Sequence, residues 1–461
     1  MAPSVGVEWW RSPAMVGPAQ ARPEAAPAKD SAVPFAASLI FTSVLLLAPE
    51  TSIPGLGRVR LAFLMGVFAI AAYCWTRLAA GRPLMRVTRE VWLVGALLGW
   101  AVITLPFSKE MSESTRVLLD VFVKSLGAFW LVSNTVTTLG RLRMTAWVLG
   151  ITSLPLAAIA AWEFVSHRVI PLGESQSGRI AGYSVAGNRA GLTGDANTLA
   201  MMLNLILPLT VALFFVTRRP WARGLLAVLI ALDASAIVFT FSRGGFVTLG
   251  ITFILYLRTL HKWRERQWVI AAVVLAMAAI PLMPRAYLDR LDTLTSINAD
   301  SSAAQRWQSI RFGLPFVLSH PLPIGLGMNA IVLAEAEESE RQSIPIRIGG
   351  VKECFCLGVH NTYLDYGIEL GWFGLGLFIL LLASCIRSAT RVRDRCAGLP
   401  RLRELSVLAE GIRLTLVAFA VSAFFFPWPY YLYFYYFAGL AVAAGAVYEA
   451  EARTAAEVPS G

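Results

Sequence analysis

The feature that most constrains this chain is a succession of long, continuous apolar runs. The chain has 461 residues, of which 56% are hydrophobic and only 15% are charged. A soluble domain cannot bury that much apolar surface, because large chains divide into domains whose surfaces stay polar. Runs of about 20 residues fit the width of a bilayer core, where only helices and closed barrels satisfy the backbone. Because these runs do not alternate with polar residues, we predict an all-α polytopic membrane protein.

The runs predict about 12 transmembrane helices. They cover residues 34–48, 59–78, 91–107, 117–137, 145–165, 198–216, 221–241, 244–259, 267–284, 364–386, 411–426 and 430–448. Five segments follow from this spacing: a disordered cytoplasmic tail (1–33), helices 1 to 9 (34–284), a periplasmic loop with amphipathic helices (285–363), helices 10 to 12 (364–448) and a cytoplasmic tail (449–461).

Lys and Arg gather in alternate connections between the runs. The positive-inside rule places these connections and both chain termini in the cytoplasm. The other connections, which include 166–197, 242–245 and 285–362, then face outward. In a bacterium this means that the periplasm borders them and that the membrane is the inner one. The net charge of +11 could suggest nucleic acid. No basic domain exists, however, so we expect membrane lipids and no nucleic acid as partners.

Several arginines occur where this rule does not favour them. Arg179, Arg189, Arg243, Arg306 and Arg311 all fall in connections predicted to face outward. Arg243 is at membrane depth, where an unpaired charge costs about 2.5 to 3.5 kcal/mol. A headgroup or a protein carboxylate could pair with it. Several guanidinium groups on one side indicate phosphate instead, because their planar forks match phosphate oxygens. We therefore predict a phosphate-bearing lipid substrate.

A histidine precedes the tenth run, in the stretch "GVHNTYLDYGIELGW". A helix that starts at about Thr362 would have Asn361 as its N-cap, with Asp365 and Glu369 on one face. A carboxylate near the imidazole of His360 would orient it, and histidine can accept a hydroxyl proton as a general base. An ordinary hydrogen-bonded histidine at the membrane interface is the alternative.

No cofactor or metal is expected from the motifs. The remaining histidines, His167, His261 and His320, are spread along the chain and show no zinc-ligand spacing. Arginine would then neutralise charge that a metal neutralises in other enzymes. Cys354 and Cys356 are too close in sequence for an unstrained bridge, so free thiols are our interpretation, and an oxidised pair stays open.

Four segments resemble the O-antigen ligase and Wzy-type polymerase superfamily of bacterial inner membranes. They are "NRAGLTGDANTLAMMLNLILPL", "TFSRGG", "RWQSIRFGLPFVLSHPLPIGLGMN" and "HNTYLDYGIELGWFGLGLF". Their order resembles that family, as does a large outer loop between helices 9 and 10. The likeness covers roughly residues 180 to 385; the earlier runs share only hydropathy with it.

The resemblance implies a GT-C-like, metal-independent glycosyltransferase that uses a glycan linked to undecaprenyl diphosphate at the periplasmic face. By motif, Arg189 and Arg243 would bind the diphosphate, and His360 would be the catalytic base. Arg306 matches the outer-loop arginine of the family, with Arg311 as the other candidate at that spacing. Asn361 and Glu369 fall inside the matched motif as supporting residues, and Asp365 joins them on its helix face. Direct displacement would invert the anomeric carbon.

Two activities share these motifs and differ in the acceptor. A ligase transfers to the lipid A-core, whereas a polymerase transfers to a second lipid-linked glycan; we favour the ligase. A protein O-oligosaccharyltransferase is a third variant. Outside the enzyme class, a lipid-linked glycan transporter could use the charges within the spans, namely Asp120, Lys124, Glu163 and Asp233. Structural pairing is our preferred explanation of those charges.

Overall fold

The structure is a computed structural model, which describes residues 31–47, 60–166, 177–180, 183–186, 196–240, 242–262, 267, 301–332 and 359–457. Side chains are described for residues 31–47, 60–164, 197–240, 242–260, 267, 307, 309–332 and 359–454. The chain divides into two units at Ala32, and of the first unit only Ser31 and Ala32 are described. Everything below concerns the second unit, Val33–Gly461.

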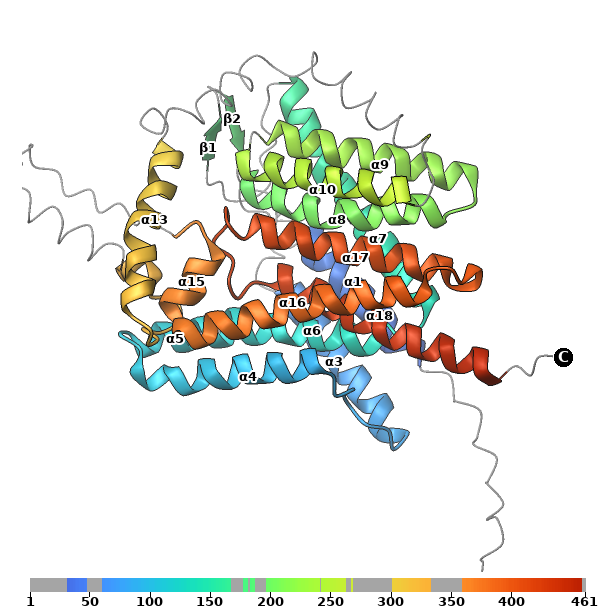
Figure 1. Cartoon of the computed structure of the whole chain (residues 1–461), viewed down its shortest axis with the longest axis horizontal. Coiled ribbons are helices and arrows are strands. Elements are labelled where there is room, and N and C mark those ends of the chain that lie inside the picture. Colours follow the sequence, from blue (N-terminus) through green and yellow to red (C-terminus); the bar gives the residue numbers. More distant parts are fainter. Residues whose placement is uncertain are drawn as a thin grey trace, which may run out of the picture. The chain divides into compact units, whose positions relative to one another are not determined.

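Helices dominate the described residues (Figure 1). They are α1 (Ala32–Leu47), α3 (Leu61–Ala79), α4 (Arg89–Thr104), α5 (Met111–Val117), α6 (Val123–Thr135), α7 (Leu139–Ser166), α8 (Ala196–Val216), α9 (Pro220–Phe239), α10 (Arg243–Lys262), α13 (Ser301–Ser319), α15 (Thr362–Glu369), α16 (Gly371–Cys396), α17 (Arg403–Ser422) and α18 (Leu432–Glu457). Short 3-10 turns lie at Leu105–Phe107 and Pro400–Leu402, and a π-helical turn at Leu118–Phe122 joins α5 to α6.

One small sheet departs from the all-helical prediction. Strands β1 (Ser177–Ile180) and β2 (Tyr183–Ala186) pair antiparallel, with Ser177 opposite Ala186. They fall in the connection predicted to face outward, outside every predicted run. Each predicted run that the structure describes is mainly helical.

Eight helical segments in the described part of the chain are long and apolar enough to cross a membrane. This agrees with the predicted class, a polytopic membrane protein. The predicted run 267–284 lies outside the described residues except for Gln267, so the total number of spans stays a prediction.

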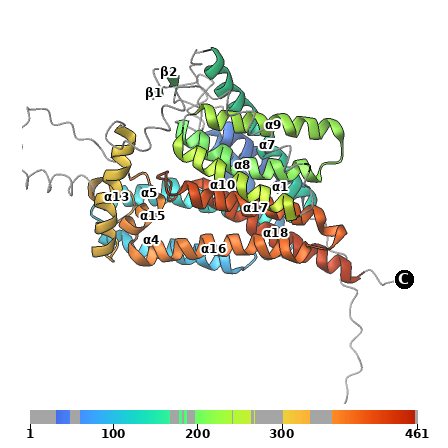
Figure 2. The ribbon, with the colours of Figure 1, turned by 45° about the horizontal axis from the view of Figure 1, so that its top comes forward.

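Helix α17 is the centre of the packing. It packs against α8, α10, α16 and α18, and Figures 1 and 2 both show it between the α8 to α10 group and the α16 and α18 pair. In its apolar stretch 78% of the residues are buried, compared with 11% in the apolar stretch of α3. In addition α18 packs on α6, and α16 packs on α4. Because α17 lies between these helices, residues at both of its ends can contact several other helices.

Connections predicted for one side of the membrane meet at one end of the bundle. At the α15 end, the backbone N–H of Lys109 donates to the carbonyl of Ile324 at 3.1 Å, and the backbone N–H of Thr362 donates to the carbonyl of Ala423 at 2.8 Å. At the opposite end, Arg143 pairs with Glu404 at 3.1 Å, and this end is called the Glu410 end below. These contacts agree with the predicted alternation of the connections that they join, and the assignment of each end to a side of the membrane stays a prediction.

The tenth predicted run, 364–386, is not one helix. The backbone breaks between α15 and α16 at Gly371, whose φ of 68° lies in the left-handed region that favours glycine. A Cβ atom there would lie 2.5 Å from the carbonyl oxygen of Pro321, and Trp372 donates its backbone N–H to the same carbonyl at 3.1 Å. The residues after α13 therefore pack against the break between α15 and α16.

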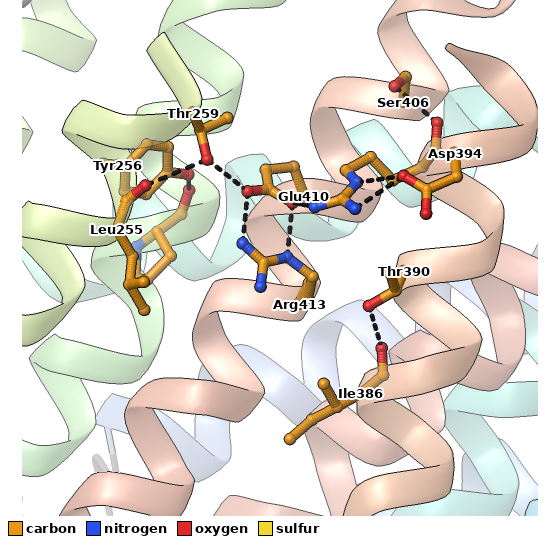
Figure 3. A network of polar contacts seen from close by, with 11 residues as sticks. Leu255, Tyr256, Thr259, Ile386, Thr390, Asp394, Ser406, Glu410 and Arg413 are labelled. Carbon is orange, nitrogen blue, oxygen red and sulfur yellow. Dashed lines mark hydrogen bonds and ion pairs between the residues drawn. The ribbon is translucent and has the colours of Figure 1, made fainter. Parts of the chain in front are cut away.

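Helix α17 begins at Arg403, eight residues before the predicted run 411–426. The prediction started late because the charged residues in the first turns of α17 lower the hydropathy there. Those charges are paired at the Glu410 end (Figure 3). Glu410 is fully buried and accepts hydrogen bonds from Arg413 at 2.7 Å, Arg393 at 3.0 Å and Thr259 at 2.7 Å. These contacts tie α10 and α16 to α17, so a buried carboxylate with two guanidinium partners takes the place of apolar packing there.

Candidate active site

The start of α15 follows His360 directly and is built as the sequence predicts. The side chain of Asn361 accepts hydrogen bonds from the backbone N–H groups of Tyr363 at 3.0 Å and Leu364 at 3.2 Å. This confirms Asn361 as the N-cap, which satisfies two of the first N–H groups of the helix. His360 itself is half-buried. Its position is therefore set by a capped helix start.

The same helix start is fastened to the end of α17. Thr362 donates its hydroxyl to the carbonyl of Phe426 at 2.6 Å, and its hydroxyl accepts the backbone N–H of Trp428 at 3.2 Å. Tyr363 donates its hydroxyl to the carbonyl of Ala420 at 2.8 Å. Residues 420–428 therefore form a platform for the residues that follow His360.

Arg243 is the first residue of α10 and is buried, with 7% of its surface exposed. Helix α10 begins in close contact with the same platform: a Cβ atom at Gly244 would lie 2.7 Å from Cβ of Phe425. On its other side, a Cβ atom at Gly245 would lie 2.7 Å from Cβ of Ala200 in α8. Asn204 of α8 donates to the carbonyl of Gly245 at 3.0 Å. Only glycine allows this approach of α10 to α8 and α17.

Arg243 and His360 thus belong to elements that dock on one platform at one end of α17. The prediction that these two residues lie on the same side of the bundle agrees with this geometry. Their roles in binding and catalysis stay predictions.

The remaining arginines are placed less completely. Arg311 is exposed on α13, and its guanidinium lies 5.6 Å from the ring centroid of Phe312. Helix α13, which confirms the predicted helix over this stretch, packs on α15 through an apolar cluster that includes Val317, Leu364 and Ile368. Arg189 and the side chain of Arg306 lie outside the described residues.

The two carboxyls of α15 lie on one face, as predicted, and both bond to Asn329. Asp365 and Glu369 are 0% and 1% exposed. Asp365 accepts a hydrogen bond from the side chain of Asn329 at 2.5 Å, and Glu369 accepts from the backbone N–H of the same residue at 3.4 Å. Both carboxyls therefore contact the turn after α13, and the expectation that a carboxylate orients His360 stays a prediction.

Burial governs the charge of this pair. Desolvation raises the pKa of Glu369 to about 7, although the hydrogen bond from the backbone N–H of Asn329 favours its ionised form. Burial, together with the charge of Glu369, raises the pKa of Asp365 well above its usual range. Two such groups so close together retain a proton at neutral pH.

Asn329 and Tyr430 were missed from the sequence. Tyr430 is 2% exposed and lies beside Glu369, and the nearby Tyr366 hydroxyl donates to the carbonyl of Pro429 and contacts the hydroxyl of Tyr435 at 2.8 Å. No periodic pattern singles out either residue. The available signal for Asn329 was an asparagine directly after "GLGM", a turn-forming stretch.

In the part of the chain that the structure describes, no group of three or more His, Cys, Asp or Glu side chains could hold a metal ion. Cys74, Cys385 and Cys396 are free thiols. Cys354 and Cys356 lie outside the described residues, and so do His167 and the side chain of His261. Metal independence stays a prediction.

The helices, their apolar faces and their alternating connections define a polytopic membrane protein, and a polar site lies at one end of its bundle. Residues 225–379 match the family model Wzy_C, described as O-antigen ligase, and this match confirms the resemblance to the O-antigen ligase and Wzy superfamily. The matched segment runs from α9 to the first part of α16 and contains Arg243, Arg306, Arg311 and His360. No curated protein matches the chain.

Proposed function

We propose that the protein is a membrane glycosyltransferase, and specifically an O-antigen ligase. It transfers a glycan from undecaprenyl diphosphate to a hydroxyl of the lipid A-core at the periplasmic face of the bacterial inner membrane. The observation that carries this proposal is the common platform at residues 420–428, on which the starts of α10 and α15 both dock. The family match, which spans both elements, supports it.

The reaction is a direct displacement. The acceptor hydroxyl attacks the anomeric carbon, His360 takes its proton, and the bond to the diphosphate breaks, which inverts the configuration. Arg243, with Arg189 and either Arg306 or Arg311, stabilises the negative charge that grows on the leaving diphosphate. Because diphosphate is a good leaving group, the chemistry needs no strong general acid and, in our proposal, no metal.

The capped start of α15 suits the role proposed for His360. A general base must be held within hydrogen-bond reach of the proton that it removes. The cap at Asn361 and the two hydrogen bonds of the Thr362 hydroxyl restrict the backbone next to the imidazole. We infer that this end of α15 is rigid so that His360 meets the acceptor in one orientation.

A Wzy-type polymerase is the alternative, since the same groups would act on a second lipid-linked glycan. A protein O-oligosaccharyltransferase would again differ only in its acceptor. The GT-C-like arrangement and the inner-membrane location, with both termini in the cytoplasm, belong to each of these proposals.

The contacts of the charges within the spans favour structural pairing over a transport path. Asp120 and Lys124 form an ion pair of 2.8 Å within one helical segment, and both side chains are exposed. Asp233 of α9 accepts a hydrogen bond from Ser153 of α7 at 3.0 Å. A transporter would need such charges along an internal route.

The test is a deletion strain whose lipopolysaccharide and exopolysaccharide are extracted and analysed. Full-length polymer that is not attached to lipid A supports the ligase. Single repeat units attached to lipid A would instead support the polymerase. Lipid-linked glycan that accumulates on the cytoplasmic side would refute the enzyme and indicate transport. Complementation with the wild-type chain must restore the normal pattern.

A further inference from the structure

The turn at residues 325–329 is held from both sides. On one side, Asn329 bonds to both buried carboxyls of α15, and the backbone N–H of Gly325 donates to the carbonyl of Glu369 at 3.1 Å. On the other side, Ser114 of α5 donates to the carbonyl of Leu326 at 2.8 Å. The turn therefore joins α15 to α5.

The turn has little room to shift. Gly325 has a φ of 110°, which disfavours other residues, and a Cβ atom there would lie 2.1 Å from Oγ of Ser108. A Cβ atom at Gly327 would lie 3.0 Å from Val117. Leu326, between these glycines, is fully buried. Because the turn is so closely packed, we expect that a negative charge on the carboxyls beneath it would weaken its packing.

The buried pair lacks a compensating cation. Within the described residues, no Lys or Arg forms an ion pair with Asp365 or Glu369, and Oδ2 of Asp365 has no hydrogen-bond partner. The other titratable groups beside the pair are tyrosines: Tyr366 on α15, and Tyr430 and Tyr431 in the loop after α17. Tyr435 on α18 contacts the hydroxyl of Tyr366. Across the turn, Glu113 and Arg116 of α5 pair with each other. An unpaired buried carboxylate is costly, so the pair is stable when it holds a proton.

We propose that Asp365, Glu369 and Asn329 form a proton-holding clamp that keeps the 325–329 turn on α15, and that Asn329 is a positioning residue of the transfer reaction. The second half rests on the function proposed above. The clamp fixes α15 from its C-terminal half, whereas Asn361 and Thr362 fix its start. The turn also follows α13, which carries Arg311, so one clamp couples both elements.

The sign of the pH dependence follows from the direction of the shifts. In the unfolded chain the two acids titrate near pH 4, whereas in the folded chain burial raises the pKa of Glu369 to about 7 and that of Asp365 well above its usual range. The folded state thus binds more protons over this window. The clamp is strongest below about pH 4, and it weakens as pH rises through 7.

Cysteine labelling tests the clamp without any need for activity. Leu326→Cys is buried in the turn, and Leu322→Cys, at a position that is 74% exposed, serves as the reactivity control. Labelling by a maleimide in purified proteoliposomes is quantified at each position by peptide mass spectrometry. The ratio of labelling at 326 to that at 322 should be low at pH 6 and rise severalfold by pH 9. A constant ratio over this range would overturn the clamp.

Three variants in the Leu326→Cys background sharpen this test. Asn329→Ala should raise the labelling ratio already at pH 6, because it removes the side-chain hydrogen bond to Asp365. Glu369→Gln and Asp365→Asn, which mimic the protonated acids, should keep the ratio low up to pH 9. Protection that is unchanged in Asn329→Ala, or lost at pH 6 in both amide variants, would contradict the proposal.

Transfer activity tests the positioning role separately. Asn329→Ala should lower kcat about tenfold with little change in the KM for the lipid-linked donor, because the proposal gives Asn329 a positioning role and assigns donor binding to the arginines. Glu369→Gln should move the alkaline limb of the kcat profile to higher pH. Glu90→Gln, which alters a buried carboxyl bonded to Ser384, should leave the profile unchanged.

The two proposals fail differently. A labelling ratio that behaves as described, in a protein that transfers no glycan, would refute the proposed function and leave the clamp standing. Normal transfer with a wild-type pH profile in Glu369→Gln would refute the role of the clamp in transfer and leave the proposed function standing.

Discussion

Arg243 combines burial with a full positive charge, and it begins a helix whose next two residues are glycines. Such a residue needs an anionic partner, either from the protein or from a ligand. His360 lies before a capped helix on the same platform. In the proposed reaction, Arg243 would therefore bind phosphate and His360 would accept the proton.

Replacement of His360 by alanine should lower kcat by about 10² to 10⁴, which is the usual contribution of a general base. The apparent affinity for the lipid-linked donor should stay within about twofold. His320→Ala is the matched control, because His320 is exposed at the end of α13 and bonds only locally, to Ser319 and Phe316. Equal transfer rates in purified membranes for His360→Ala and wild type would remove the base assignment.

Replacement of Arg243 should act on the donor. Arg243→Ala should raise the KM for the diphosphate-linked donor by about 10-fold or more, whereas Arg243→Lys should recover part of the loss, since lysine keeps the charge but lacks the planar fork. Arg258→Ala, an exposed arginine at the other end of the same helix, should behave as wild type. Steady-state kinetics at varied donor concentration measure the difference. An unchanged KM in Arg243→Ala would exclude the phosphate role.

At the scale of elements, the site depends on how closely α10 approaches α17. Gly244 packs on Phe425 and Gly245 on Ala200, so neither of these two positions has space for a side chain. Farther along the same helix, Gly250 has open space around it. The two positions allow the close approach to be tested apart from helix propensity.

Gly244→Ala should lower stability by about 1 to 3 kcal/mol, since the added methyl group overpacks against the side chain of Phe425. Gly250→Ala should instead stabilise by about 0.5 to 1 kcal/mol through helix propensity. Thermal unfolding of the detergent-purified protein, with donor affinity as a second measurement, checks both. Similar midpoints for the two variants would show that α10 does not pack on α17 as described.

The break between α15 and α16 shows how an element boundary arises from distant residues. Trp100 of α4 donates to the carbonyl of Leu370 at 2.8 Å, and the indole of Trp372 donates to the carbonyl of Val317 at 2.5 Å. Trp100 satisfies a carbonyl at the break, whereas Trp372 satisfies a carbonyl in the last turn of α13. Hydropathy alone does not reveal this break, because apolar residues continue through it.

At the scale of the whole molecule, the two ends of α17 hold opposite kinds of polar structure. The α15 end contains two buried acids without a basic partner, whereas the Glu410 end contains one buried acid with two guanidinium partners. The second arrangement ties three helices together. Its removal should therefore affect the whole bundle.

Glu410→Ala should destabilise the protein by about 3 to 5 kcal/mol, because Arg393 and Arg413 would lose their shared partner. Glu404→Ala, which removes the more exposed pair with Arg143, should cost about 1 kcal/mol or less. The thermal midpoint of the purified protein distinguishes them. Equal effects would mean that the Glu410 network contributes nothing beyond an ordinary surface pair.

The orientation in the membrane is the remaining whole-molecule prediction. Position 322 lies at the α15 end and position 399 at the Glu410 end, and both leucines are exposed. In intact spheroplasts a membrane-impermeant maleimide should label Leu322→Cys, and it should label Leu399→Cys only after permeabilisation. Peptide mass spectrometry separates these sites from the native cysteines. The reverse pattern would place the site in the cytoplasm and exclude the proposed reaction.

Hydrophobic length, the distribution of Lys and Arg, and a local cap depend on neighbouring residues only, so the order of amino acids suffices to predict the apolar helices, the alternation of the connections and the capped start of α15. It also brought Arg243 and His360 forward, through an unfavourable charge at membrane depth and a motif. The folded chain was needed to find that Asn329 donates a hydrogen bond to Asp365, that the tenth run breaks at Gly371, and that α17 begins at Arg403. These features depend on contacts between segments far apart in the sequence, where a buried polar group finds whichever partner the packing brings to it.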